Sequence, residues 1–483
     1  MSVTFSPSQP VSSVASPEET DGSCRAPVLL LFASSSAWLV IASVLELIAS
    51  LKFHMPGLLA ACPWSTYGRV QPAQLNALVY GFAAQAVLGV ALWLVARLGK
   101  TILALAGVVT VGAVFWNVGV TLGILGILAG DSTGYEWLEM PRYASPVLLA
   151  AYAVIGLAAL LTFLQRREAP LQASQWFLLA ALFWFPWIYS TANLLLVFAP
   201  VRGMMQAVVA WWYVGNLTNI WFGFIGLAVL FHFIPQLAGR PLHSYYLAMF
   251  AFWTLALFGG WGNIPHSAPV PSWLPSLSTV FAVLTVLPII AIAMNLRQAL
   301  AGQSAKIKES LPLRLCAFSV TAYVLAGLLN VLVALDEVQN IVHFTLFMPA
   351  LRQLFLFGFV GLATFAAIYY IVPRLMGSEF PSARLVKFHV TLTLLGLAFY
   401  VIPLAVGGVL QGLALNDPNV AFMDRLKPAL MFFRVSTLGD LMLLAGNLAL
   451  LLNFVRLFAR CCRTCCVPVI VAATKPQIAE AAR

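Results

Sequence analysis

Charged residues are scarce in this chain of 483 residues. Asp, Glu, Lys and Arg together make up only 9% of the sequence, whereas hydrophobic residues make up 61%. A water-soluble domain of this size could not expose such a composition to solvent without aggregating. The composition excludes a soluble enzyme or binding module and predicts a protein that crosses a membrane many times.

The sequence also lacks short motifs that carry soluble-enzyme chemistry. It contains no glycine-rich phosphate-binding loop and no C-x-x-C-H motif for covalent haem attachment. Any function must therefore rest on polar groups inside the membrane, where each such group is costly and is a candidate site.

Twelve apolar runs, give or take one, match the roughly 20 mostly apolar residues that a spanning helix needs. The expected spans are 26–51, 73–98, 101–129, 144–166, 175–199, 202–236, 243–262, 273–297, 312–335, 349–373, 385–413 and 428–460. They predict an all-α polytopic membrane protein with a single transmembrane domain over residues 26–460. Residues 1–25, rich in Ser and Pro and without the apolar core of a cleaved signal, are expected to be a disordered cytoplasmic tail.

Basic residues gather in alternate connections between the expected spans. If the N-terminus lies inside, the even-numbered loops and the C-terminal tail hold most of the Lys and Arg. The opposite loops hold most of the acids, namely Asp131, Glu136, Glu139, Asp336, Glu337, Asp417 and Asp424. Because basic loops stay on the cytoplasmic side during insertion, we expect both termini to be cytoplasmic, in the inner (cytoplasmic) membrane. The net charge of +10 is then explained by topology and anionic lipid, without a nucleic-acid partner.

The predicted cytoplasmic tail, residues 461–483, is polar and begins with a cysteine cluster. Cys461, Cys462, Cys465 and Cys466 lie in the sequence ARCCRTCC. This spacing is too tight for the usual paired-hairpin zinc site, and a reducing compartment disfavours disulfides. We expect structural or incidental thiols, with lipidation and metal binding as the alternatives.

Arg352 is the intramembrane charge that most needs a partner. It lies in MPALRQLFLFGF near the outer end of the tenth span, and a guanidinium cannot lose its proton to make burial cheaper. Glu46 and Asp440 are the acids within the other expected spans that can pair with it. The sequence therefore predicts a buried ion pair of Arg352 with Glu46 or Asp440.

Several stretches resemble one family. They are GRVQPAQLNALVYGF (68–82), WWYVGNLTNIWFGFIGLAVLFHFIPQLAGRPLHSYYL (211–247), the loop WGNIPHSAPVPSW (261–273), HFTLFMPALRQLFLFGFVGLATFAAIYYIVPRL (343–375) and GGVLQGL (407–413). In this order and spacing they resemble the catalytic subunit I of haem-copper oxidases, with the C-type (cbb-type) cytochrome c oxidases as the most similar branch. The resemblance implies a twelve-helix bundle.

The same resemblance implies six histidine ligands for two haems and a copper ion, since these metals favour neutral imidazole nitrogens. The chain has six histidines, but none stands at a ligand position. The haem-ligand positions fall at Gln74, Leu351 and Gln353, and the copper-ligand positions at Gly215, Asn263 and Ile264. We therefore expect no haem and no copper, with haem b only if the ligands are unconventional.

The resemblance also matches groups that surround the metal sites in that family. Arg69 matches a basic residue near the haem carboxylates, and Tyr323 falls close to the active-site tyrosine. His266 and His343 match histidines outside the ligand set. Such groups orient ligands in a working site, whereas here they can equally serve only to bind loops and water.

The first functional hypothesis is a respiratory or electron-transfer subunit that has lost its cofactors and acts as a structural or docking component. Its expected partners are other membrane subunits, such as a membrane-anchored cytochrome c, and the lipid bilayer. The alternative is a terminal oxidase or nitric-oxide-reductase-like enzyme that binds haem unconventionally. A second alternative is a transporter or channel, because twelve helices also suit that class.

Overall fold

The computed structural model describes residues 15–480 except 168, 169, 263 and 420, and its described side chains end at Arg460 and omit Pro428. Every regular element in this part of the chain is a helix. Four of the helices that cross the bundle contain a π-helical segment, and these segments are named η2, η3, η4 and η5. The label η1 denotes a short 3₁₀ turn.

The elements follow one another as a simple series of passes. In chain order they are α1 (Pro17–Lys52), η1 (Pro63–Ser65), α2 (Tyr67–Asn76), η2 (Ala77–Ala83), α3 (Ala84–Gly99), α4 (Ala106–Ala129), α5 (Ala144–Leu164), α6 (Ala173–Asn193), η3 (Leu194–Phe198), α7 (Met205–Gly215), η4 (Asn216–Phe222), α8 (Gly223–Ala238), α9 (Tyr245–Phe258), α10 (Trp273–Leu284), α11 (Val286–Leu300), α12 (Ser304–Glu309), α13 (Leu311–Val333), α14 (Asp336–Val342), α15 (Phe347–Gln353), η5 (Leu354–Gly361), α16 (Leu362–Met376), α17 (Ala383–Leu415) and α18 (Phe422–Glu480).

Within the described residues, eleven continuous helices are long and apolar enough to cross a membrane. The seventh expected span, 243–262, is represented by the shorter helix α9, which has 14 residues. The predicted all-α polytopic bundle with about twelve membrane helices is thus confirmed. At 1.5 Å per residue α9 is about 21 Å long, so the chain leaves helical geometry before it has crossed the bilayer core.

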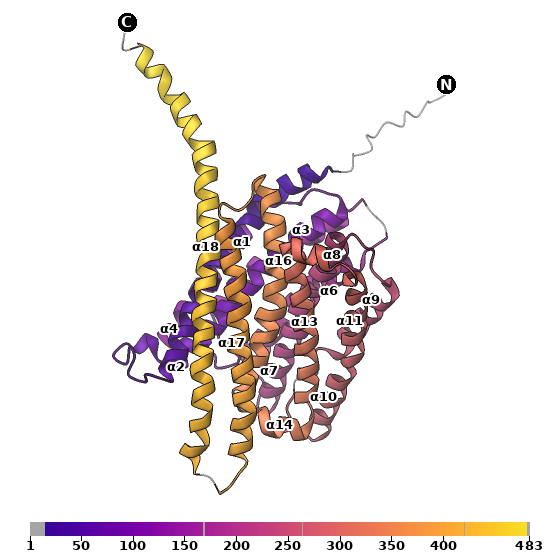
Figure 1. The fold of residues 1–483 in the computed structure, drawn as a ribbon, viewed down its shortest axis with the longest axis vertical. Helices are drawn as coiled ribbons and strands as arrows, with labels where there is room; N and C mark the ends of the chain where they lie inside the picture. Colours follow the sequence, from indigo (N-terminus) through magenta and orange to yellow (C-terminus); the bar gives the residue numbers. More distant parts are fainter. Residues whose placement is uncertain (1–14, 168–169, 263, 420, 481–483) are drawn as a thin grey trace.

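Three passes are the most deeply buried part of the bundle. In the most apolar windows of α2–η2–α3, α7–η4–α8 and α15–η5–α16, 100%, 83% and 94% of the residues are buried, against 33–50% in the other eight. α17 and α18 pack along each other (Figure 1), and α1 packs against both α3 and α18. The helices that carry Gln74, Gly215 and Gln353 are therefore the innermost ones.

The predicted disordered tail over residues 1–25 is wrong for residues 17–25, which form the first turns of α1. Ser16 Oγ accepts a hydrogen bond from the backbone N–H of Glu19 (3.2 Å), and the Glu19 carboxylate accepts one from the N–H of Ser16 (2.7 Å). With Pro17 as the first helical residue, this capping box starts the helix early. Residues 1–14 lie outside the described residues.

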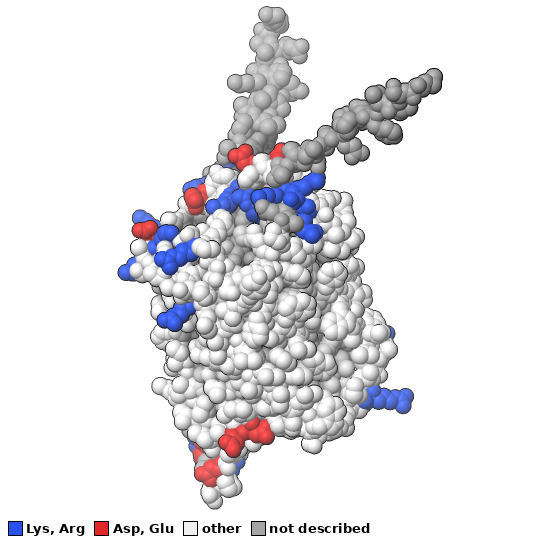
Figure 2. All heavy atoms as spheres, turned by 90° about the vertical axis from the view of Figure 1, so that its right-hand side faces the viewer, with Lys and Arg blue, Asp and Glu red and all other residues white. Residues whose placement is uncertain are grey.

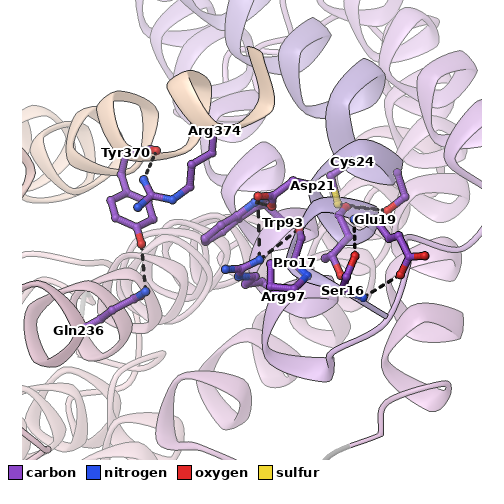
Figure 3. Close-up of polar contacts among 12 residues, drawn as sticks. Ser16, Pro17, Glu19, Asp21, Cys24, Trp93, Arg97, Gln236, Tyr370 and Arg374 are labelled. Atoms are coloured by element: carbon purple, nitrogen blue, oxygen red, sulfur yellow. Dashed lines mark hydrogen bonds and ion pairs between the residues drawn. The ribbon is translucent and has the colours of Figure 1, made fainter. Parts of the chain in front are cut away.

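Polar contacts fasten the first turns of α1 to the bundle (Figure 3). Trp93 Nε1 on α3 donates to Asp21 Oδ1 (2.8 Å), and Arg97 lies 3.9 Å from the same carboxylate. On neighbouring helices, Gln236 Nε2 donates to the Tyr370 hydroxyl (2.9 Å). These bonds satisfy polar groups at one end of α1, α3, α8 and α16.

Charged side chains separate toward the two ends of the molecule. Figure 2 shows a band of Lys and Arg near the end from which α18 projects, a broad belt with few charges, and Asp and Glu toward the opposite end. α1 begins and α18 ends on the Lys- and Arg-rich side (Figure 1). The opposite end is called the outer end below. For the predicted tail 461–483, α18 continues to Glu480, and the four cysteine side chains lie outside the described residues.

Candidate functional site

The three central passes change from α- to π-helical geometry beside the positions singled out in the sequence. η2 begins three residues after Gln74, η4 begins one residue after Gly215, and η5 begins one residue after Gln353. A π-helical turn holds one extra residue and often marks a functional site. The candidate site is therefore the region where α2, α7 and α15 end and these three segments start.

Gln74 and Gln353 face one small cavity. Its volume is about 20 Å³, and its polar lining also includes Ser43, Glu46 and Asp440. Ala42, Leu78, Phe357 and Leu443 complete the wall. A cavity of this volume has room for about one water molecule. The structure thus brings together the two glutamines and both candidate acids.

The acids in this cavity are only partly hydrogen-bonded. The Tyr400 hydroxyl on α17 donates to Glu46 Oε1 (3.2 Å). Asp440 is 2% exposed, and no described residue offers a hydrogen bond to its Oδ1. Neither glutamine amide is hydrogen-bonded to another described residue. Buried polar groups in this state require water, a proton or a ligand.

The prediction that Arg352 pairs with Glu46 or Asp440 is wrong, because its partner is a different acid. Arg352 Nη1 lies 2.6 Å from Glu136 Oε1, in the loop between α4 and α5. The Arg352 side chain is 24% exposed and that of Glu136 is 61% exposed, so the pair meets solvent. The prediction failed because it considered acids of the spans alone, whereas the loop folds over the end of α15.

Glu139 in the same loop is a buried group whose importance the sequence did not indicate. It is 6% exposed, and Asn76 Nδ2 on α2 donates to its Oε2 (2.7 Å). Burial raises the pKa of Glu139 to about 7, although the Asn76 hydrogen bond favours the ionised form. Asn76 lies two residues after Gln74 and so points to another face of α2, and neither Asn76 nor Glu139 lines the glutamine cavity.

The other side of the η5 segment is dry and aromatic. Phe359 packs on Tyr323 with ring centroids 4.8 Å apart, and it contacts α8 at Gly226. A Cβ at Gly226 would lie 2.6 Å from Phe359 Cζ, so glycine allows the ring to approach the helix. Leu351 is buried nearby on α15 at 8% exposure. Apolar and aromatic side chains occupy this region.

Asparagines on η4 satisfy the end of the short helix α9. Asn216 Nδ2 donates to the carbonyl of Gly260 (3.2 Å), and Asn219 Nδ2 donates to that of Gly259 (2.9 Å). Trp184 Nε1 in turn donates to Asn216 Oδ1 (2.9 Å). Carbonyls at a helix end inside a membrane must find donors within the protein. These amides therefore support the irregular backbone that follows α9 in the sequence.

The predicted copper-ligand positions lie in or beside this irregular segment. Ile264 is 5% exposed, and its N–H donates to Ser278 Oγ (2.9 Å). Gly215 is buried at the end of α7 and has no side chain. Asn263 lies outside the described residues.

The residues predicted to surround a metal site contact separate parts of the fold. His266 Nε2 lies 2.6 Å from Asp336 Oδ1 and 2.7 Å from Thr279 Oγ1, so it joins the outer loop to α14 and α10. Arg69 Nη1 donates to the carbonyl of Leu128 (3.3 Å) at the end of α4.

His343 and Tyr323 also stand apart from those two residues. The His343 ring lies against Phe344 at 4.5 Å, and its Nδ1 has no hydrogen-bond partner among the described residues. Burial lowers the pKa of His343, an effect that Glu136 partly offsets. Tyr323 lies within the aromatic region. The four residues do not converge on one centre.

Comparison with known proteins identifies the family. The sequence model of the family described as Cytochrome C and Quinol oxidase polypeptide I matches residues 26–442. The chain belongs to this family. The resemblance to haem-copper oxidase subunit I is thereby confirmed.

Curated relatives of this oxidase-family chain match most of its length. It is 25% identical over 437 residues to the cytochrome c oxidase subunit 1 homolog of Agrobacterium tumefaciens (strain T37), covering 86% of this chain and 80% of that protein. It is 24% identical over 437 residues to the Cbb3-type cytochrome c oxidase subunit CcoN1 of Stutzerimonas stutzeri, covering 86% of this chain and 91% of that protein.

The oxidase fold is also found by structural comparison. A heme-copper terminal oxidase dimer solved by cryo-EM matches with a TM-score of 0.68 at 15% identity, covering 89% of this chain and 83% of that chain. The sequence has diverged far more than the bundle, so chemistry has to be judged from the residues at the site.

Proposed function

We propose that this oxidase-family chain holds no haem and no copper and acts as a structural or docking subunit of a membrane complex. The observation that carries the proposal is the cavity between Gln74 and Gln353. Its volume is about 20 Å³, room for one water molecule rather than a porphyrin.

The donor atoms at the site do not suit the family's cofactors. Haem iron and copper favour imidazole nitrogen, whereas Gln74 and Gln353 offer amide oxygens, which are weak ligands for these metals. Gly215, Leu351 and Ile264 offer no side-chain ligand atom. The residues present do not fit a haem or a copper ion, and we derive no oxygen chemistry from this chain.

Aromatic packing supports the same proposal. Phe357 lies between Phe82 and Phe365, with centroid distances of 6.3 Å and 5.8 Å, where an open cofactor pocket needs space. Trp221 of η4 packs on Phe185 of α6, with ring centroids 4.4 Å apart. Close aromatic contacts of this kind stabilise the bundle in place of a bound ring system.

The relatives support a role within a complex. Two of them are named as subunits of cytochrome c oxidases. We therefore propose other membrane subunits as partners, among them a membrane-anchored cytochrome c. The distribution of Lys and Arg toward one end supports an inner (cytoplasmic) membrane location with both termini cytoplasmic (Figure 2).

Haem and metal content test the proposal. The full chain, purified in mild detergent, is expected to show no Soret absorption, no pyridine haemochrome and no stoichiometric copper. The Stutzerimonas stutzeri subunit CcoN1, expressed and purified in parallel, is the matched control for haem incorporation. Stoichiometric haem b in the purified chain overturns the proposal and establishes the enzyme alternative.

Cross-linking in native membranes tests the docking role. We expect membrane subunits to be recovered in constant stoichiometry with the chain after cross-linking and purification. Recovery of the chain alone at every cross-linker concentration contradicts a docking role, whatever its haem content.

A further inference from the structure

A chain of hydrogen-bonding side chains runs from the outer end of the bundle toward the glutamine cavity. His54 follows α1, and its Nε2 lies 2.8 Å from Thr437 Oγ1 on α18. Thr437 Oγ1 lies 2.7 Å from Ser50 Oγ on α1. The Ser50 side chain also lies close to the carboxyl of Asp440. Every member of this chain can accept one proton and release another.

This series of side chains ends at the carboxyl group of Asp440, which has an acceptor oxygen without a hydrogen bond from the described residues. Asp440 lines the cavity and is 2% exposed, and its Oδ1 has no partner among the described residues. Gln74, 6% exposed, faces the same cavity with an amide that is not hydrogen-bonded to another described residue. Buried acceptors of this kind are satisfied by a proton or by a water molecule, and the cavity has room for one water.

Glu46 and Asp440 both line the cavity, and no cation among the described residues lines it with them. The titratable or charged groups that act on them come from α1, α2, α15, α17 and α18 and are Glu46, Tyr67, Arg352, Tyr400 and Asp440. Arg352 is the one cation among them, and it is paired with Glu136 at 2.6 Å. No Lys or Arg lines the cavity. Two like charges this close in a low dielectric cannot both be ionised without a counter-charge.

His54 stands at the outer end of this hydrogen-bonded series, and its Nδ1 is buried without a partner among the described residues, so it needs a water molecule or a proton. Burial lowers the pKa of His54, and the nearby Arg434 lowers it further, so both favour the neutral imidazole. A neutral imidazole accepts a proton on one nitrogen as it releases a proton from the other.

We propose that the cavity is a proton-binding site open to the outer face, in which Glu46 and Asp440 share a proton that His54, Thr437 and Ser50 deliver. Each transfer breaks one N–H or O–H bond and forms another, and no electrons are exchanged. The proton enters from outer water at His54 and is held on a carboxyl oxygen beside the water-sized cavity. The inference rests on the proposed function in one respect, because a haem held by Gln74 and Gln353 would fill that cavity.

Infrared spectroscopy of the purified full chain tests this inference. We expect a protonated carboxylic acid C=O band at neutral pH, which shifts when the sample is transferred to D₂O. Because Glu139 is also partly protonated at neutral pH, the comparison is made in a Glu139→Gln background. In this background Glu46→Gln and Asp440→Asn, which nearly preserve side-chain volume, are expected to remove or displace this band. Absence of the band from the Glu139→Gln protein, or its full retention in both further variants, overturns the proposal.

The delivery route is tested by the rate of the same deuterium shift. Thr437→Val removes the hydroxyl between His54 and Ser50 and is expected to slow the shift severalfold while the band keeps its intensity. Thr393→Val is the control for loss of a threonine hydroxyl, because Thr393 lies on α17 outside the proposed route; it is buried, whereas Thr437 is partly buried. An equal exchange rate in the two valine variants overturns the route.

The haem spectrum of the same samples separates this inference from the proposed function. Stoichiometric haem contradicts the cofactor-free proposal alone, whereas the carboxylic acid band and its exchange rate decide the proton site.

Discussion

The two sides of the η5 segment differ in how they are filled. On one side, Gln74 and Gln353 meet Glu46 and Asp440 around a polar cavity of about 20 Å³. On the other side, Phe359 packs against apolar and aromatic neighbours. The aromatic side satisfies itself by close packing, whereas the polar side retains groups that need a proton or water. One segment of the bundle thus separates a closely packed region from a region with unsatisfied polar groups.

The largest expected effect is on the aromatic side. Phe359→Ala removes a fully buried ring, and large-to-small changes of this kind cost about 3–5 kcal/mol of unfolding free energy. The measurement is the unfolding midpoint in detergent, followed by intrinsic tryptophan fluorescence. Phe344→Ala is the control, since Phe344 is 80% exposed. Equal stability of the two variants would show that the aromatic side is loosely packed.

A smaller loss of unfolding free energy is expected when the contacts between η4 and the irregular backbone after α9 are removed. Asn216→Ala leaves the Gly260 carbonyl and the Trp184 indole N–H without their partner. Each buried polar group left unsatisfied costs about 1–3 kcal/mol. Asn219→Ala removes a single bond, to Gly259, and should cost less in the same unfolding experiment. The reverse order of the two variants contradicts the assignment of Asn216 as the main support.

The helices could be predicted from the sequence, because hydropathy alone locates runs of the required length. Two features had no such signal. A π-helical segment such as η2 leaves the apolar pattern unbroken, and α9 ends early although apolar residues continue to Trp261. The start of α1 at Pro17 was missed because a Ser- and Pro-rich composition concealed the capping box at Ser16 and Glu19.

The candidate site could be predicted in part. The resemblance singled out Gln74 and Gln353, and the structure places both at one cavity. The partner of Arg352 was missed because a loop acid such as Glu136 is ordinarily solvated. Only the fold of the loop between α4 and α5 shows that Glu139 is buried, since nothing in the local sequence distinguishes the two acids.

The pH dependence of Glu139 adds a buried acid outside the cavity to the comparison. Its pKa is raised to about 7 in the folded protein, so between its unfolded value of 4.5 and 7 the folded state binds more protons. Stability is therefore highest at low pH and falls as pH rises through this window. We expect the difference in unfolding free energy between parent and Glu139→Gln to change by about 2 kcal/mol from about pH 5 to about pH 7.

The difference between the parent and Glu139→Gln isolates the contribution of Glu139, because the other carboxyl groups titrate in both proteins and cancel. Glu139→Gln keeps the oxygen that accepts from Asn76 Nδ2. A pH profile that is parallel in parent and variant contradicts the raised pKa, and a stability that rises more steeply in the parent contradicts its direction.

The smallest effect is expected for the ion pair at the boundary between the two sides. Arg352 stands between Leu351 and Gln353 and meets Glu136, which is 61% exposed, so solvent screens the pair. A double-mutant cycle with Arg352→Gln and Glu136→Gln should give a coupling energy below about 1 kcal/mol that decreases further at high salt. The exposed pair of Asp424 and Lys427, also 2.6 Å apart, is the matched control for a fully solvated bridge. A large and salt-independent coupling would instead place Arg352 in the low-dielectric interior, where its charge would act on the shared proton of Glu46 and Asp440 and join the two sides into one electrostatic unit.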